Sequence, residues 1–161
     1  MTTDETIYED TSLDLCLSRL EIIASNPSPT LITSLIQPLQ LNLFLLLAYI
    51  QTKPQSLIKS RVIHLFEVYF TSSPTPANDI LHLIDDILNR PSDWSFSPGG
   101  HGGIAIKRNY SFESLNLEFI EPRIESVLTI LEKVSESTKS EVFVGIVRKW
   151  FSLEDELDPM L

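Results

Sequence analysis

Residues Pro29 to Gln51 read PTLITSLIQPLQLNLFLLLAYIQ and contain the strongest apolar run of the chain, from Leu43 to Ile50. Eight residues cover only about 12 Å as a helix, whereas a hydrocarbon core is roughly 30 Å thick. The run therefore predicts a fully buried helix and not a membrane span. Pro38 lies inside the stretch, where it lacks an N–H and clashes with the preceding turn, so we expect a kink or break near Gln37.

Apolar residues at the 3.6-residue period predict further helices on both sides of this stretch. A helix capped by Ser12 ends at the breaker Asn26-Pro-Ser-Pro29, and Pro54 is expected as the first residue of the next. The remaining helices are predicted from about Asn78 to Asn89 and from Pro122 to about Val134, with a last helix after the polar stretch 135–139 that extends to Leu153; residues 111–121 have no clear pattern. In the last helix the pattern predicts a buried side made of Val142, Phe143, Ile146, Val147, Trp150 and Phe151.

These helices pair into units of residues 12–51, 54–90 and 122–153, of which the first two have about the 40-residue size of HEAT and armadillo repeats. The fold class expected is all-α, with HEAT/armadillo-like antiparallel helix pairs forming an α-solenoid segment. A closed helical bundle is the alternative. The domain boundaries expected are an acidic disordered tail at 1–11, a helical-repeat domain at 12–153 with a glycine-rich loop at 91–110, and an acidic tail at 154–161.

Trp94 to Lys107 read WSFSPGGHGGIAIK and hold four of the five glycines of the chain. Glycine tolerates positive φ without steric cost, so Gly99, Gly100, Gly102 and Gly103 predict a sharp turn. A phosphate-binding loop would need these glycines between a buried strand and a helix start. Trp94-Ser-Phe-Ser does not read as a buried strand, and Ile104-Ala-Ile-Lys alternates like a strand. An ordered loop or short hairpin is therefore expected.

The candidate partner-binding residues lie in this stretch. Tryptophan is enriched at the centres of protein interfaces, so Trp94 and Phe96 are candidate anchors, together with the turn formed by Gly99, Gly100, Gly102 and Gly103. The competing interpretation is that the two aromatic side chains pack the loop onto its neighbours, and we favour that interpretation.

The net charge of −10 is concentrated at the two ends of the chain. Four acidic residues lie between Asp4 and Asp10 and four between Glu154 and Asp158, with no basic residue in either segment. Such a chain is repelled by nucleic-acid phosphates and by anionic lipid, so direct nucleic-acid binding and membrane insertion are disfavoured. Acidic ends can instead dock on basic protein partners.

No pattern for catalysis, cofactors or metal binding is found in the sequence. Three scattered histidines and a single cysteine lack metal-ligand spacing, and neither a nucleophile elbow nor a kinase set occurs. Cys16 lies in an apolar pattern and is predicted to be buried and inert. The acidic N-terminal residues do not resemble a signal peptide, so a cytoplasmic location, extending to the nucleus, is expected.

Several features in a fixed order resemble a known family. They are Leu-Ile-x-Pro-Leu at Pro38, Phe66-Glu-Val-Tyr-Phe70, the stretch from Trp94 to Ile106, Glu121-Pro-Arg-Ile124 and Val147-Arg-Lys-Trp150. This order resembles a segment of the RNA polymerase II assembly and nuclear-import factors, called Tango-six proteins in animals. The glycine-rich turn followed by Ile-x-Ile is the most specific part.

The resemblance implies a helical-repeat scaffold without enzymatic activity, which binds RNA polymerase II subunits and nuclear-pore components and is also linked to secretory-pathway organisation. This chain is short for that family, and no family binding residue is carried onto it. The function expected is therefore a noncatalytic α-solenoid scaffold that binds proteins. The alternative is a small helical ligand-binding or enzyme domain that uses the Gly99–Gly103 loop.

Overall fold

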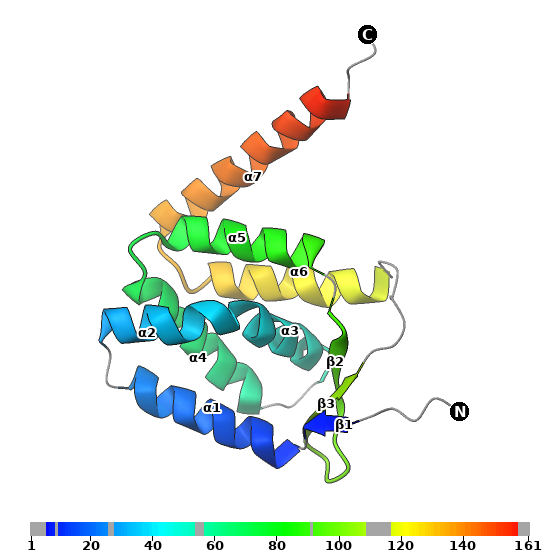
Figure 1. Cartoon of the computed structure of the whole chain (residues 1–161). Helices are drawn as coiled ribbons and strands as arrows, with labels where there is room; N and C mark the ends of the chain where they lie inside the picture. The colour runs from blue at the N-terminus through cyan, green and yellow to red at the C-terminus, as the bar shows by residue number, and fades with distance from the viewer. Residues whose placement is uncertain are drawn as a thin grey trace.

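The computed structural model of the chain describes residues 6–8, 10–25, 28–53, 57–90, 92–108 and 117–157, and all their side chains except those of residues 6, 7, 10, 117, 118 and 154–157. This part of the chain is mostly helical, as predicted, with one small sheet at the edge of the helical body (Figure 1). The elements in order are β1 (Thr6–Tyr8), α1 (Asp10–Ala24), α2 (Pro29–Ile36), the 3-10 turn η1 (Gln37–Leu39), α3 (Gln40–Gln51), α4 (Leu57–Ser72), α5 (Pro76–Asn89), β2 (Trp94–Pro98), β3 (Ile104–Arg108), α6 (Leu117–Leu131) and α7 (Glu136–Leu157).

The predicted break at Gln37 is confirmed, because α2 ends at Ile36 and η1 carries Pro38 before α3 begins. The apolar run of α3 is buried as expected, including Leu43, Phe44, Leu46, Leu47, Ala48 and Ile50. Among the described helices, only the stretch Pro29–Gln51 has the length and apolar composition to cross a membrane. In this structure its α3 half forms the centre of the core.

Helix α4 contacts α1, α2, α3 and α6, and supplies buried Val62, Leu65, Phe66, Tyr69 and Phe70 to the same core. The Tyr69 hydroxyl donates a hydrogen bond of 2.9 Å to Oδ2 of Asp79 in α5. Burial, reinforced by this contact with a carboxylate, raises the pKa of Tyr69. The polar end of a core side chain thus connects two helices.

Arg61 of α4 connects this helix to α1 through polar contacts. Its guanidinium is half-buried and lies 2.6 Å from Oδ1 of Asp14 and 2.9 Å from Oε2 of Glu21, both in α1. Nη2 also donates to the Ser18 hydroxyl at 3.0 Å. The planar guanidinium can satisfy several acceptors at once, so it attaches α1 to α4 at a point without apolar contact.

The sheet has the order β1-β3-β2 and is antiparallel throughout. β2 and β3 form the expected hairpin, with Phe96 opposite Ile106 and Ser97 opposite Ala105. Trp94-Ser-Phe-Ser is a strand of this hairpin and, as predicted, not a buried one. One prediction fails here, because residues 6–8, expected in a disordered tail, form β1 against β3. A three-residue strand is too short to show periodicity, and it forms by pairing with a segment far away in the sequence.

Three further predictions need correction. Pro122 was expected in the first turn of a helix but lies inside α6, which begins at Leu117. Cys16 was expected to be buried and is exposed. Residues 154–157 were expected in an acidic tail but belong to α7, which continues to Leu157. The proposed start at Pro54 lies outside the described residues.

Candidate protein-interaction surfaces

Trp94 and Phe96 occupy alternate positions of β2 and therefore point to the same side of the sheet. Their rings meet edge to face, with centroids 5.1 Å apart at 85°, and Phe96 lies 6.2 Å from the Tyr49 ring of α3. Both side chains are half-buried and line a cavity of about 520 Å³ between the sheet, α1 and α3. The geometry supports the packing interpretation of this aromatic pair.

The glycine turn lies beyond the other end of β2. The Gly99 N–H donates to the Gly103 carbonyl at 2.7 Å, and the Gly102 N–H donates to the Gly99 carbonyl at 3.3 Å. Gly102 has φ +85°, and a Cβ placed at Gly100 or Gly102 would meet no atom within 4 Å. The turn joins two strands and precedes no helix, so it lacks the geometry of a phosphate loop. The six candidate residues therefore do not form one site.

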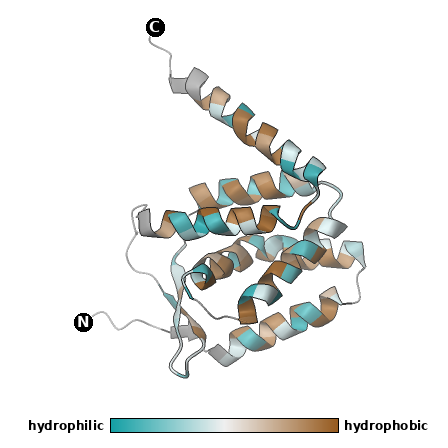
Figure 2. Ribbon diagram, turned by 180° about the vertical axis from the view of Figure 1, so that it is seen from behind, coloured by the Kyte–Doolittle hydropathy of each residue, from teal (hydrophilic) through white to brown (hydrophobic). Residues whose placement is uncertain are grey.

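Helix α7 carries the largest disagreement with the sequence-based prediction. It leaves the helical body and projects from it, and brown apolar residues follow its projecting part (Figures 1 and 2). Val142 is buried as predicted, but Phe143, Ile146, Trp150 and Phe151 of the predicted buried side are exposed. The periodicity correctly identified an apolar side. It could not show that no helix of the described chain covers it.

Three of these side chains, Phe143, Ile146 and Trp150, lie on one line along the helix with the exposed Leu153, and we call this line the α7 seam. The four side chains are 68%, 41%, 67% and 48% exposed. Their spacing of three, four and three residues is the pattern of a helix that packs against another helix through a narrow stripe. Val144 and Phe151 beside this line are exposed too, at 44% and 64%. The apolar residues of α7 were visible in the sequence, but their exposure was not.

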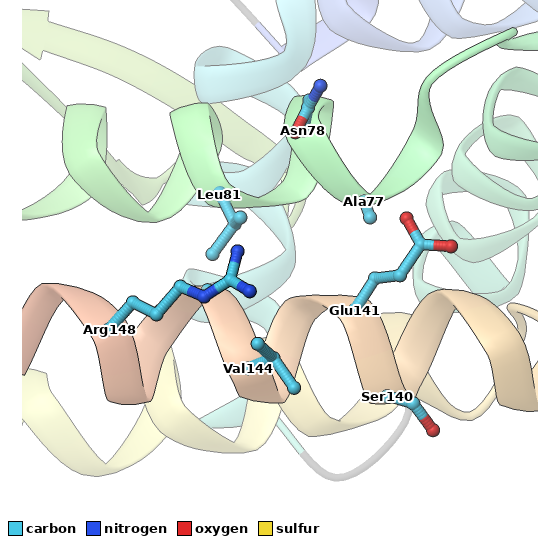
Figure 3. Close-up of a pocket in the computed structure, with 8 residues that line it drawn as sticks. Ala77, Asn78, Leu81, Ser140, Glu141, Val144 and Arg148 are labelled. Atoms are coloured by element: carbon cyan, nitrogen blue, oxygen red, sulfur yellow. The ribbon is translucent and has the colours of Figure 1, made fainter.

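The attachment of α7 to the body uses a neighbouring face. Gly145 lies so close to α5 that a Cβ built on it would be 2.4 Å from Cδ1 of Leu81, and Lys149 pairs with Asp85. Figure 3 shows Leu81 of α5 and Glu141 and Arg148 of α7 pointing into the space between the two helices, where a cleft of about 370 Å³ lies. The seam is therefore not used by the contact with α5.

Within the described residues, no three histidine, cysteine or acidic side chains gather in a way that could hold a metal ion. Comparison of the chain with protein-family models, curated proteins and solved structures gives no match. The family resemblance stays a prediction from the residues that carry it.

Proposed function

We propose that this chain is a noncatalytic protein-binding segment and that the α7 seam is its principal contact surface. One observation carries the proposal: four large apolar side chains lie in line on a helix that projects from the body. Aligned exposed apolar residues of this kind mark interaction sites, whereas scattered ones are ordinary. Helices recognised by other proteins present anchors at the same spacings of three, four and seven residues.

The packing of the helices supports the finer proposal of an α-solenoid segment. Counted as one kinked helix, α2 and α3 together lie between α1 and α4 in the chain order. Helix α1 packs on α4, and α5 packs on α7, so in both cases one helix of the sequence is skipped. Contacts between alternate helices are what stacked helix pairs produce, although α3 also packs on α6.

The family resemblance supplies the cellular setting of the proposal. It points to RNA polymerase II assembly and nuclear import, with polymerase subunits and nuclear-pore components as the partners and with the cytoplasm and nucleus as the location. The acidic ends of the chain agree with protein partners and disfavour nucleic acid.

The test compares proteins that copurify with three forms of the chain from the native cell. The seam variant is Phe143→Asp with Trp150→Asp, and the control is Ile22→Asp, which is 69% exposed. Ile22 belongs to α1, a helix on the other side of the helical body from α7 (Figure 1). We expect the amount of a set of copurified proteins to be about ten-fold or more lower with the seam variant than with the unaltered chain, and to be unchanged with the control. The same proteins in equal amounts with all three forms would contradict the proposal.

A further inference from the structure

The cavity of about 520 Å³ between the sheet, α1 and α3 has the size of a small-molecule site, since such sites measure about 300–1,000 Å³. Its interior is apolar. Leu17, Leu43 and Leu46 line it and are at most 5% exposed, and the half-buried rings of Trp94 and Phe96 line it from the sheet. Small-molecule sites combine such an apolar interior with a few polar groups at fixed places.

The polar groups of this cavity lie at its rim. Arg19 of α1 and Asn42 of α3 line the cavity and are exposed, as is the thiol of Cys16. Cys16 and Arg19 are three positions apart and therefore lie on one side of α1. Among the described residues that line the cavity, Arg19 is the only charged one. An apolar interior thus opens beside a single positive charge.

The Arg19 guanidinium has no hydrogen bond or ion pair with another residue in the described part of the chain. The described acidic side chains of α1, Asp14 and Glu21, both pair with Arg61 of α4. Helix α1 therefore leaves Arg19 without one of these carboxylates. A guanidinium presents parallel N–H donors that match the two oxygens of a carboxylate. The charge at the rim is thus complementary to an anionic group on a molecule held in the cavity.

We propose that this cavity binds a fatty acid, with its alkyl chain against the apolar interior and its carboxylate at Arg19. The inference goes beyond the proposed function, because it concerns another surface and stands whether or not α7 binds a protein. Each methylene removed from water should tighten binding by about four-fold, so the chain supplies most of the affinity. The pair between the carboxylate and Arg19 is exposed to water, so it contributes less and mainly orients the ligand.

The first test uses the full chain with octanoate, decanoate and dodecanoate, each below the concentration at which it forms micelles. Cys16 provides the readout, because it is the only cysteine of the chain and lines the cavity. We expect each carboxylate to slow the reaction of Cys16 with iodoacetamide. Half-maximal protection should need about ten-fold less ligand for each lengthening by two methylenes.

The second test concerns the carboxylate and compares decanoate with decanol by calorimetry. Arg19→Glu should weaken decanoate binding by about three-fold or more at low salt and leave decanol binding unchanged. The control is Lys133→Glu, which makes the same change in net charge at an exposed position that does not line the cavity. It should change the binding of neither ligand.

The third variant, Leu20→Trp, places a large side chain in the cavity that Leu20 lines, so it should abolish the protection of Cys16. Circular dichroism melts establish that each variant is folded, and the labelling of the unaltered chain decides the matter if Leu20→Trp is not.

Three results would overturn the proposal. Unchanged labelling of Cys16 with all three carboxylates would mean that the cavity takes no fatty acid. Equal binding of decanoate and decanol, both insensitive to Arg19→Glu, would assign the cavity to uncharged apolar molecules instead. Full protection in a folded Leu20→Trp variant would place the ligand outside the cavity.

Discussion

Leu46 is the residue at which the apolar run of α3 can be tested most simply. It is buried in the core, so Leu46→Asp places a carboxylate among apolar side chains and away from bulk water. Burying an unpaired charge costs several kcal/mol, against roughly 5–15 kcal/mol for the stability of a whole domain. We expect the variant to be unfolded by circular dichroism. Leu57→Asp, at an exposed position of α4, is the control and should remain folded. A folded, cooperative Leu46→Asp variant would show that this face is not core.

Trp94 decides between the two interpretations of the aromatic pair. Its ring packs on Phe96 and lines the cavity beside α1 and α3, so we expect Trp94→Ala to lower the free energy of unfolding by about 2 kcal/mol, less than for a fully buried tryptophan. Denaturant unfolding and partner pull-down on the same variant provide the measurement. Unchanged stability with abolished partner binding would make Trp94 an interface anchor instead.

At the scale of elements, the contact between α5 and α7 depends on the absence of a side chain at Gly145. Gly145→Val would force its methyl groups into Leu81, so we expect α7 to detach, at a cost of about 1–3 kcal/mol. Hydrogen exchange should become faster in residues 136–149 and stay unchanged in α3 and α4. Leu81→Ala in the same chain should restore part of the protection, because it removes the clashing atoms. Unaltered exchange in Gly145→Val would mean that the two helices are not in close contact.

The elements also show what the sequence could predict. The kinked pair α2–α3 was predictable because Pro38 breaks a helix whatever surrounds it. The hairpin was predictable because glycines followed by alternating apolar residues have few other conformations. Strand β1, the role of Arg61 and the start of α6 were not predictable, since each depends on a contact with a distant segment.

At the scale of the whole molecule, the same limit applies to the candidate site. The period-3.6 pattern of α7 identified its apolar residues, including Phe143, Ile146 and Trp150. Which of them lie against the body depends on how α7 docks on α5, and that docking is decided by Gly145 and Leu81. A prediction made from one helix at a time therefore assigned to the core a surface that no described part of the chain covers.

The described part of the chain thus has a helical body with a buried core and a helix, α7, whose projecting part presents apolar residues outward. Replacing an exposed side chain of that helix should leave the body intact, whereas the partner should be lost. This separation between stability and binding is the central claim, and it concerns Trp150 above all.

Quenching of Trp150 fluorescence tests this claim most directly. The chain has two tryptophans, so Trp94→Phe leaves Trp150 as the only emitter. Acrylamide quenching is then measured on the free chain and on its complex with a copurified partner. We expect Trp150 to be freely quenched in the dilute chain, in keeping with its exposure of 67%, and strongly protected in the complex. Protection of Trp150 from quenching in the free, dilute chain would contradict the assignment of the α7 seam as the binding surface. Free quenching of Trp150 within the complex would contradict it as well.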